Sequence, residues 1–225
     1  HRKEPTSELE IQHNESFVEL ILNAEQKKIY DSLIEDKKKF KVNVIRGVTG
    51  SGKTELYVKL AKKSIEENFQ TLVMVPEINL IPQTLERFKK YSKIVPLQYH
   101  SNLTPIQKHK VWKACSIEEQ IVVIGTRSSI FLPFEKLGLI VVDEEHDGSF
   151  KQSDGVLYNA RDMAVVRAKL EGCLAVLASA TPSLESIINV KRGMYRHLVL
   201  PERHAGASMP EVQMIDLRLC PLPRQ

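Results

Sequence analysis

The chain has 225 residues, with 32 Lys and Arg against 28 Asp and Glu, so its net charge is only +4. This length can bury the core of one domain, or of one domain plus a tail, and the charge permits a nucleic-acid partner without arguing for one. The three cysteines are isolated and no apolar run approaches the roughly 18 residues of a membrane span, so we expect a cytosolic protein with reduced thiols, no zinc site and no membrane contact.

The N-terminal part of the chain begins with a polar segment. Residues 1–16 show no hydrophobic period, and we interpret them as a linker or tail. Because the chain starts with His1 rather than Met, we expect a piece of a longer protein. A helical pattern follows with steps of three and four residues, and Asn23 is placed to cap its second part. The positions in this pattern are Leu20, Ile21, Ala24, Lys28, Ile29, Leu33 and Ile34.

From residue 42 onward, short apolar runs alternate with helical stretches. The runs, which suit strands covered on both faces, are residues 42–45, 71–75, 94–98, 121–124, 139–142, 174–178 and, less clearly, 197–200. The helices expected between them are residues 55–67, 80–90, 105–115, 160–171 and 183–190. This alternation predicts an α/β fold with a mostly parallel sheet and right-handed crossovers. Ligands of such sheets bind at the carboxyl ends of the strands.

The first chemical motif is a glycine loop between the strand at 42–45 and the helix at 55–67. It fits G-x-x-x-x-G-K-[ST], in which backbone N–H groups and a helix N-terminus surround phosphate oxygens. Lys53 is expected to reach the β- and γ-phosphates of ATP, and the Thr54 hydroxyl to hold Mg²⁺. The residues predicted to bind the nucleotide are Gly47, Thr49, Gly50, Ser51, Gly52, Lys53 and Thr54.

The second motif is a pair of acids at the end of the strand at 139–142. In a P-loop ATPase, Asp143 holds Mg²⁺, and Glu144 orients and deprotonates the attacking water. We expect this strand to neighbour the strand before the glycine loop, which makes the edge a hydrolytic site. Lys53, Asp143 and Glu144 are therefore the predicted catalytic residues.

Asp143-Glu144-Glu145-His146 resembles motif II of superfamily 2 helicases, and other segments agree with that resemblance. The segment Ser179-Ala180-Thr181 resembles motif III. In that family its hydroxyls sense the nucleotide state, which implies a coupling role for Ser179, Thr181 and His146. Gln26 lies where a glutamine amide reads adenine, although a surface Gln without this role is also common.

Two further segments resemble the family's nucleic-acid contacts. Residues 76–83 resemble motif Ia, and residues 125–129 resemble motif Ib, whose amides and hydroxyls meet phosphates of the tracked strand. The resemblance implies DNA contacts for Pro76, Gln83, Thr126 and Arg127.

Five segments together resemble, in order and spacing, the first motor lobe of the PriA family of bacterial replication-restart helicases. They are residues 47–55, 75–78, 99–101, 124–129 and 143–147. The match runs from about residue 22 to residue 194. It implies a RecA-like lobe over residues 17–205, and a segment leading toward a second lobe over residues 206–225. It also implies 3′-to-5′ unwinding, forked and single-stranded DNA as partners, single-strand-binding protein and primosome components as further partners, and a nucleoid-associated location in the bacterial cytoplasm.

In that family, a loop after motif II couples DNA contact to hydrolysis. Its counterpart, residues 150–162, would stack Phe150 and Tyr158 on bases and place Lys151 and Arg161 on phosphates. The alternative is that both aromatic rings pack the loop against the lobe. The sequence departs from the family at 156–157, where members often carry a further aromatic and a basic residue.

Nothing in the chain resembles the family's second lobe, which supplies arginine fingers, or its paired-cysteine zinc module. We therefore expect the chain alone to bind nucleotide weakly and to hydrolyse it poorly. Two rival functions stay open: another superfamily 2 motor acting on RNA or duplex DNA, and a nucleotide-gated DNA-binding module without activity.

Overall fold

The computed structural model describes residues 20–36, 39–48 and 50–200 of the chain. Residues 1–16 and 206–225, and Thr49, for which the sequence analysis made predictions, lie outside these ranges. The first helix, α1 (Ala24–Glu35), begins at the predicted cap. The Asn23 side chain accepts from the Gln26 amide N–H, and the Gln26 side chain accepts from the Asn23 N–H, so the capping box is complete.

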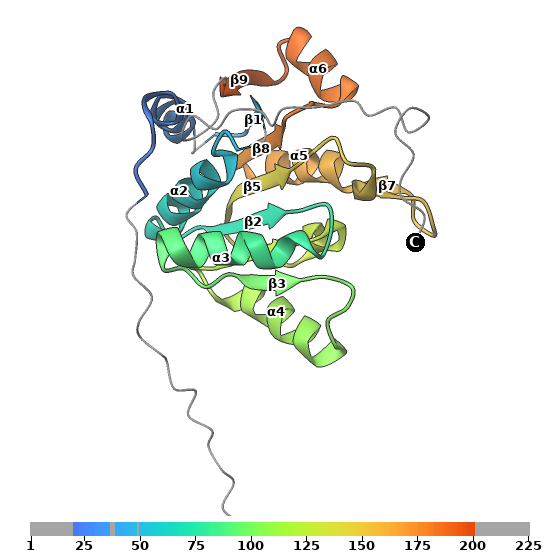
Figure 1. Ribbon diagram of the computed structural model, residues 1–225. Helices are drawn as coiled ribbons and strands as arrows, with labels where there is room; N and C mark the ends of the chain where they lie inside the picture. Colours follow the sequence, from blue (N-terminus) through green and yellow to red (C-terminus); the bar gives the residue numbers. More distant parts are fainter. Residues whose placement is uncertain (1–19, 37–38, 49, 201–225) are drawn as a thin grey trace, which may run out of the picture.

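Seven parallel strands form the central sheet, in the order β3-β4-β2-β5-β8-β1-β9 (Figure 1). Their bounds are β1 (Lys41–Gly47), β2 (Gln70–Met74), β3 (Leu97–Tyr99), β4 (Val122–Gly125), β5 (Leu137–Asp143), β8 (Leu174–Ser179) and β9 (Arg196–Leu200). This confirms the predicted α/β class and parallel sheet. The expectation that β1 and β5 are neighbours is wrong, because β8 pairs with both and lies between them.

Helices cover both faces of the sheet. On one face, α1, α2 (Lys53–Glu66) and α3 (Leu80–Ser92) pack on one set of strand side chains; on the other, α4 (Pro105–Ile117) and α5 (Ala160–Glu171) pack on the alternate set. Val73 faces the first core, whereas Leu72 and Met74 face the second. Side chains of a strand alternate between faces, so a strand covered on both sides is mostly apolar, although β1 buries Asn43 and β2 buries Gln70 and Thr71.

The remaining elements cluster at the carboxyl ends of the strands. They are two short 3₁₀ helices, η1 (Arg127–Phe131) and η2 (Gly148–Phe150), the hairpin of β6 (Lys151–Gln152) and β7 (Tyr158–Asn159), and α6 (Leu184–Lys191). The sequence did not predict the hairpin, because two-residue strands carry no readable period. Among the described residues, no helix has the length and apolar character needed to cross a membrane.

Candidate functional site: a nucleotide pocket beside a polar groove

The glycine loop lies between β1 and α2 in a conformation that glycine makes possible. Gly50 and Gly52 have φ values of 80° and 82°, in the left-handed region that other residues rarely adopt. A Cβ on Gly52 would also lie 2.0 Å from Nε2 of Gln26. Helix α2 begins at Lys53, directly after this turn, so its free N–H groups point into the loop.

Lys53 and Ser51 line the inner side of the loop. The Lys53 ammonium is buried, donates to the Gly47 carbonyl at 2.8 Å and lies 3.9 Å from the Glu144 carboxylate. The Ser51 hydroxyl is buried and has no hydrogen-bond partner. A buried donor without a partner beside a lysine and open backbone amides is what a polyphosphate would satisfy. These residues therefore fit the predicted nucleotide.

The two acids at the end of β5 face the loop. Burial and the neighbouring Glu144 charge raise the pKa of Asp143 from 3.8 to about 6, although Lys53 and the hydroxyl of Tyr57, 3.2 Å from Asp143 Oδ1, oppose the rise. Glu144 has φ of 47°, a strained value for a residue with a side chain. Burying a carboxylate at such a cost is expected where a cation binds it, so Asp143 and Thr54 are the residues that would hold Mg²⁺.

Helix α3 supplies the outer wall of the same pocket, a cavity of about 490 Å³. It is lined by Gly50, Gly52, Lys53, Thr54, Glu55, Leu80, Gln83, Thr84, Arg87, Asp143 and Glu144. Gln83 was predicted to contact DNA, but the structure places it here, on the nucleotide side. Arg87 donates to the Thr54 hydroxyl at 2.7 Å.

The predicted role of Gln26 in reading adenine also requires correction, as that of Gln83 did. Its side chain is only 1% exposed, and both ends of its amide are engaged: Oε1 caps α1, and Nε2 lies 3.3 and 3.4 Å from the carbonyls of Ser51 and Gly52. In this structure Gln26 braces the glycine loop from behind, and its amide is not available to read adenine.

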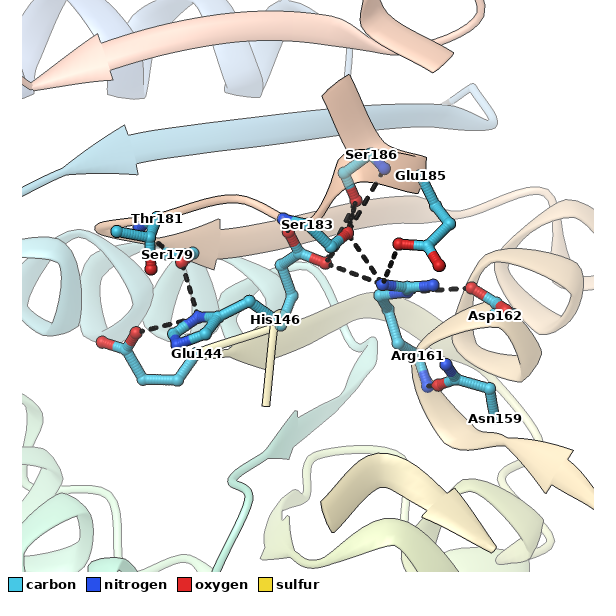
Figure 2. Close-up of polar contacts among 11 residues, drawn as sticks. Glu144, His146, Asn159, Arg161, Asp162, Ser179, Thr181, Ser183, Glu185 and Ser186 are labelled. Atoms are coloured by element: carbon cyan, nitrogen blue, oxygen red, sulfur yellow. Dashed lines mark hydrogen bonds and ion pairs between the residues drawn. The ribbon is translucent and has the colours of Figure 1, made fainter. Parts of the chain in front are cut away.

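The three residues predicted to couple nucleotide to nucleic acid lie together. The Ser179 hydroxyl is 2.7 Å from Nδ1 of His146 and accepts from the Thr181 N–H at 2.9 Å, and His146 lies 3.6 Å from the Glu144 carboxylate (Figure 2). Because β8 lies between β1 and β5, its end at Ser179 is placed between the glycine loop and the two acids. A single chain of contacts thus joins Glu144 to the segment after β8.

A second network, which we call the Glu145 joint, consists of Glu145 and its partners Arg161, Ser183 and Ser186, and Figure 2 labels these three partners. The Glu145 carboxylate accepts from the Ser183 N–H at 2.7 Å and from the hydroxyls of Ser183 and Ser186 at 2.9 and 3.0 Å. The Arg161 guanidinium donates to the Ser183 hydroxyl at 2.7 Å and lies 3.4 Å from Glu145. The joint ties the residue after Glu144 to the N-terminal ends of α5 and α6.

Arg161 was predicted to contact a DNA phosphate, and the joint contradicts this. The side chain is only 5% exposed and is also paired with Asp162 and Glu185. A guanidinium buried among three carboxylates is already neutralised, so it offers no free charge to a phosphate.

Beside the nucleotide pocket lies a polar groove, a cavity of about 580 Å³ at the same edge of the sheet. It is lined by Pro76, Glu77, Ile78, Asn79, Ser101, Thr126, Arg127, Ser128, Ser149, Gln152 and Tyr158. Pro76, Thr126, Arg127 and Tyr158 are therefore brought together. Arg127 donates to the carbonyls of Ser149 and Lys151, which fastens η1 to the hairpin.

The two aromatic residues of the loop after β5 have different environments. Phe150 is 1% exposed and belongs to the core, so the prediction that it stacks on a base is wrong. Tyr158 is part-buried, packs edge-on against Phe131 with ring centroids 5.1 Å apart, and lines the groove. Lys151 is exposed next to it. The packing alternative therefore holds for Phe150, and the stacking role of Tyr158 stays a prediction.

Sequence reasoning missed Arg87, Tyr57 and the joint. Arg87 follows Gln83 by four residues on a predicted helix, so the two share a face, and that spacing was a usable signal. Tyr57 likewise follows Lys53 by four residues in α2. No signal pointed to Ser183 or Ser186, because their role depends on α6 packing beside Glu145.

A seven-stranded parallel sheet, a glycine loop after β1 and paired acids after β5 define a RecA-like P-loop lobe. The DEAD/DEAH box helicase family matches residues 23–190, and the chain belongs to that family. It is 43% identical over 204 residues to the replication restart protein PriA of Rickettsia felis, covering 91% of this chain and 31% of that protein. It is 46% identical over 179 residues to PriA of Haemophilus influenzae, covering 80% and 24%.

The fold is also similar to RecG in a structure bound to a three-way DNA junction, with a TM-score of 0.57 and 26% identity. That match covers 84% of this chain and 25% of RecG. The chain thus spans about a quarter to a third of the length of the relatives it matches.

Proposed function

We propose that this chain is the ATP-binding first motor lobe of a bacterial 3′-to-5′ DNA helicase that acts in replication restart and primosome assembly. The observation that carries the proposal is the placement of Lys53, Asp143 and Glu144 around one pocket, beside a polar groove at the same sheet edge. The similarity to PriA over most of the chain supports the replication-restart role.

In the proposed reaction, water attacks the γ-phosphorus of ATP in line, the bond to the β,γ-bridging oxygen breaks, and ADP and inorganic phosphate leave. Lys53 would leave the Gly47 carbonyl to neutralise phosphate charge. Thr54 and Asp143 would hold Mg²⁺, which would supply Lewis-acid stabilisation of the same charge. Glu144 accepts the proton of the attacking water. His146 reports the state of the pocket through Ser179 to Thr181.

We propose the polar groove as the site for single-stranded DNA. Thr126 and Ser128 offer hydroxyls and Arg127 a guanidinium to phosphates, and Tyr158 offers a ring face to a base. Forked DNA, single-strand-binding protein and primosome components are the partners proposed for the full-length protein, in the bacterial cytoplasm near the nucleoid. The chain alone is proposed to be a weak ATPase, since one lobe supplies half of the charge stabilisation.

The test is steady-state ATP hydrolysis by the full-length protein with no nucleic acid, RNA, single-stranded DNA and a forked duplex, run beside Glu144→Gln. Stimulation by the fork that disappears in Glu144→Gln is the expected result. Stimulation by RNA above DNA would favour an RNA motor. Hydrolysis indifferent to all nucleic acids would remove the helicase function.

The groove is tested separately, by fluorescence anisotropy of labelled single-stranded DNA. Tyr158→Ala is expected to weaken binding by about 1–3 kcal/mol, because one stacking platform is lost. Trp112→Ala, which removes an exposed ring on α4 outside the groove, is the matched control and should change nothing. Equal losses in both variants would rule out a specific role for Tyr158.

A further inference from the structure

Arg87 is a charged residue in the nucleotide pocket that none of the helicase motifs above contains. It lies on α3, one turn after Gln83, and its half-buried side chain reaches across to α2. There its guanidinium donates to the Thr54 hydroxyl at 2.7 Å. Thr54 is the residue that the P-loop motif assigns to Mg²⁺, so Arg87 engages the oxygen that the cation would need.

This contact competes with metal ligation. The hydroxyl oxygen that accepts from the guanidinium has two lone pairs, but Mg²⁺ bound to the same oxygen would bring the two cations together at one atom. A guanidinium held against that oxygen would also lie close to a dication, and like charges in a partly buried pocket repel strongly. Arg87 therefore has to release Thr54 when the metal binds.

The pocket suggests where the released guanidinium goes. Arg87 lines the same cavity as the glycine loop and Lys53, so it stays within a space that fits a polyphosphate. The planar fork of arginine matches phosphate oxygens, and such charge-assisted bonds are stronger than a bond to a neutral hydroxyl. The carboxylates of Asp143 and Glu144 on the opposite wall compete less well, because Lys53 already lies near Glu144 and Mg²⁺ would take Asp143.

We propose that Arg87 is a nucleotide-binding residue that exchanges the Thr54 hydroxyl for phosphate oxygens of the bound nucleotide. The inference rests on the proposed ATP site and adds to it a cation from α3. It makes α3 sensitive to whether the pocket is filled, and Asn79, the N-cap residue of α3, lines the polar groove. If Arg87 instead only fastened α3 to α2, its loss would change stability and leave nucleotide affinity unchanged.

The test is binding of a fluorescent, non-hydrolysable ATP analogue to the purified chain, measured in excess Mg²⁺ and again in EDTA. Arg87→Gln is expected to weaken binding about tenfold under both conditions, as loss of one charge-assisted contact would. Arg87→Lys should recover part of the loss, since it keeps the charge without the fork. Lys89→Gln removes an equal charge from an exposed position of the same helix and should bind normally.

Thr54→Ala should affect binding differently in Mg²⁺ and in EDTA. It should weaken binding in Mg²⁺, because a metal ligand is lost, but not in EDTA, because Arg87 is then already free for the phosphates. Equal or tighter binding by Arg87→Gln in both conditions would overturn the proposal, leaving Arg87 a structural contact or a mere competitor of the metal. Lys53→Ala distinguishes failure of the Arg87 proposal from failure of the proposed ATP site. If this variant also bound the analogue normally, the proposal that ATP binds at this pocket would be wrong. Thermal unfolding of each variant identifies any that is misfolded.

Discussion

Two polar regions at the same sheet edge differ in whether their buried polar groups have partners within the protein. In the Glu145 joint, each carboxylate oxygen has donors, and Arg161 supplies the compensating charge in the interior. In the nucleotide pocket, Glu144 carries a strained backbone and the pKa of Asp143 is raised, and the Ser51 hydroxyl of the adjoining glycine loop has no partner. The joint is complete within the protein, whereas the pocket is not.

A missing hydrogen-bond partner alone does not mark a functional residue, since Asn43 and Thr71 in the strands are also buried without one. The pocket differs from the Glu145 joint because a raised pKa at Asp143 and a strained backbone at Glu144 occur together beside Lys53. Buried polar groups that satisfy one another hold a fold in one arrangement, and their removal leaves an unpaired partner. Buried groups that are strained or unpaired are tolerated where a ligand completes them. Asp143 and Glu145 stand two residues apart and fall on opposite sides of this division. The predictions below test that division.

The largest effect is expected in the joint. Arg161→Ala should lower the free energy of unfolding by about 3–5 kcal/mol, because Glu145 would remain buried and charged without its cation. Urea denaturation measures the change. Asp162→Ala is the control: it removes an exposed partner of the same guanidinium and should cost less than about 1 kcal/mol. Equal costs would show that the joint owes nothing to burial.

In the nucleotide pocket, removing a charge should raise the free energy of unfolding and not lower it. Asp143→Asn is expected to raise the free energy of unfolding by about 3 kcal/mol at neutral pH in the absence of Mg²⁺, since a pKa raised from 3.8 to about 6 means that the folded state disfavours the carboxylate. The folded state keeps the proton longer than the unfolded chain. The wild type is therefore not penalised below about pH 4 and loses stability as the pH rises through about 6.

The gain from Asp143→Asn should accordingly appear between those pH values, in urea denaturation followed across the pH range. Asp147→Asn is the matched control, because the Ser149 N–H lowers the pKa of Asp147. That substitution should reduce stability. A gain from both, or a gain from Asp143→Asn that did not depend on pH, would contradict the assignment of strain to the ionised Asp143.

Much of the fold and of the pocket could be predicted because both depend on local sequence. Apolar runs predicted the strands, since strands covered on both faces are mostly apolar, and glycines with a following lysine predicted the loop. The run at 94–98 was placed too early, because β3 is Leu97–Tyr99. Helix α5 (Ala160–Glu171) has the predicted bounds, because Asn159 caps it and Gly172 ends it. The position of β8 between β1 and β5 could not be predicted, since strand order depends on crossovers and not on any single run.

The errors share one cause: side chains of the same type can be buried or exposed according to long-range packing. Phe150 and Tyr158 both looked like stacking residues, yet Phe150 lies in the core and Tyr158 in the groove. Arg161 looked like a phosphate contact until α6 brought Ser183 and Glu185 beside it. At the hairpin, Val156 and Leu157 are 80% and 73% exposed. The sequence showed that these two residues replace the family's aromatic and basic residues, but it did not show whether they would be buried or exposed.

A smaller effect is expected at the glycine loop. Gly52→Ala should lower the free energy of unfolding by about 1–2 kcal/mol, because φ of 82° disfavours any Cβ and this Cβ would strike Nε2 of Gln26. Gly155→Ala shares the left-handed backbone, with φ of 70° and nothing within 4 Å of the added carbon, so it isolates the backbone term. Thermal unfolding of both variants measures the difference, and identical losses would mean that Gln26 moves aside freely.

The smallest change in the free energy of unfolding is expected for a solvent-exposed ion pair. Lys63 and Glu67 form an exposed pair one turn apart on α2, with 3.3 Å between their charged atoms, and Lys63→Ala should cost less than about 0.5 kcal/mol. That small cost should fall further as salt is added, because ions screen exposed charges, whereas the cost of Arg161→Ala should persist because no ion reaches the joint. Urea denaturation of both variants at low and high salt provides the measurement. If salt reduced both costs in proportion, the Glu145 joint would be open to solvent, and its contrast with the nucleotide pocket would lose its physical basis.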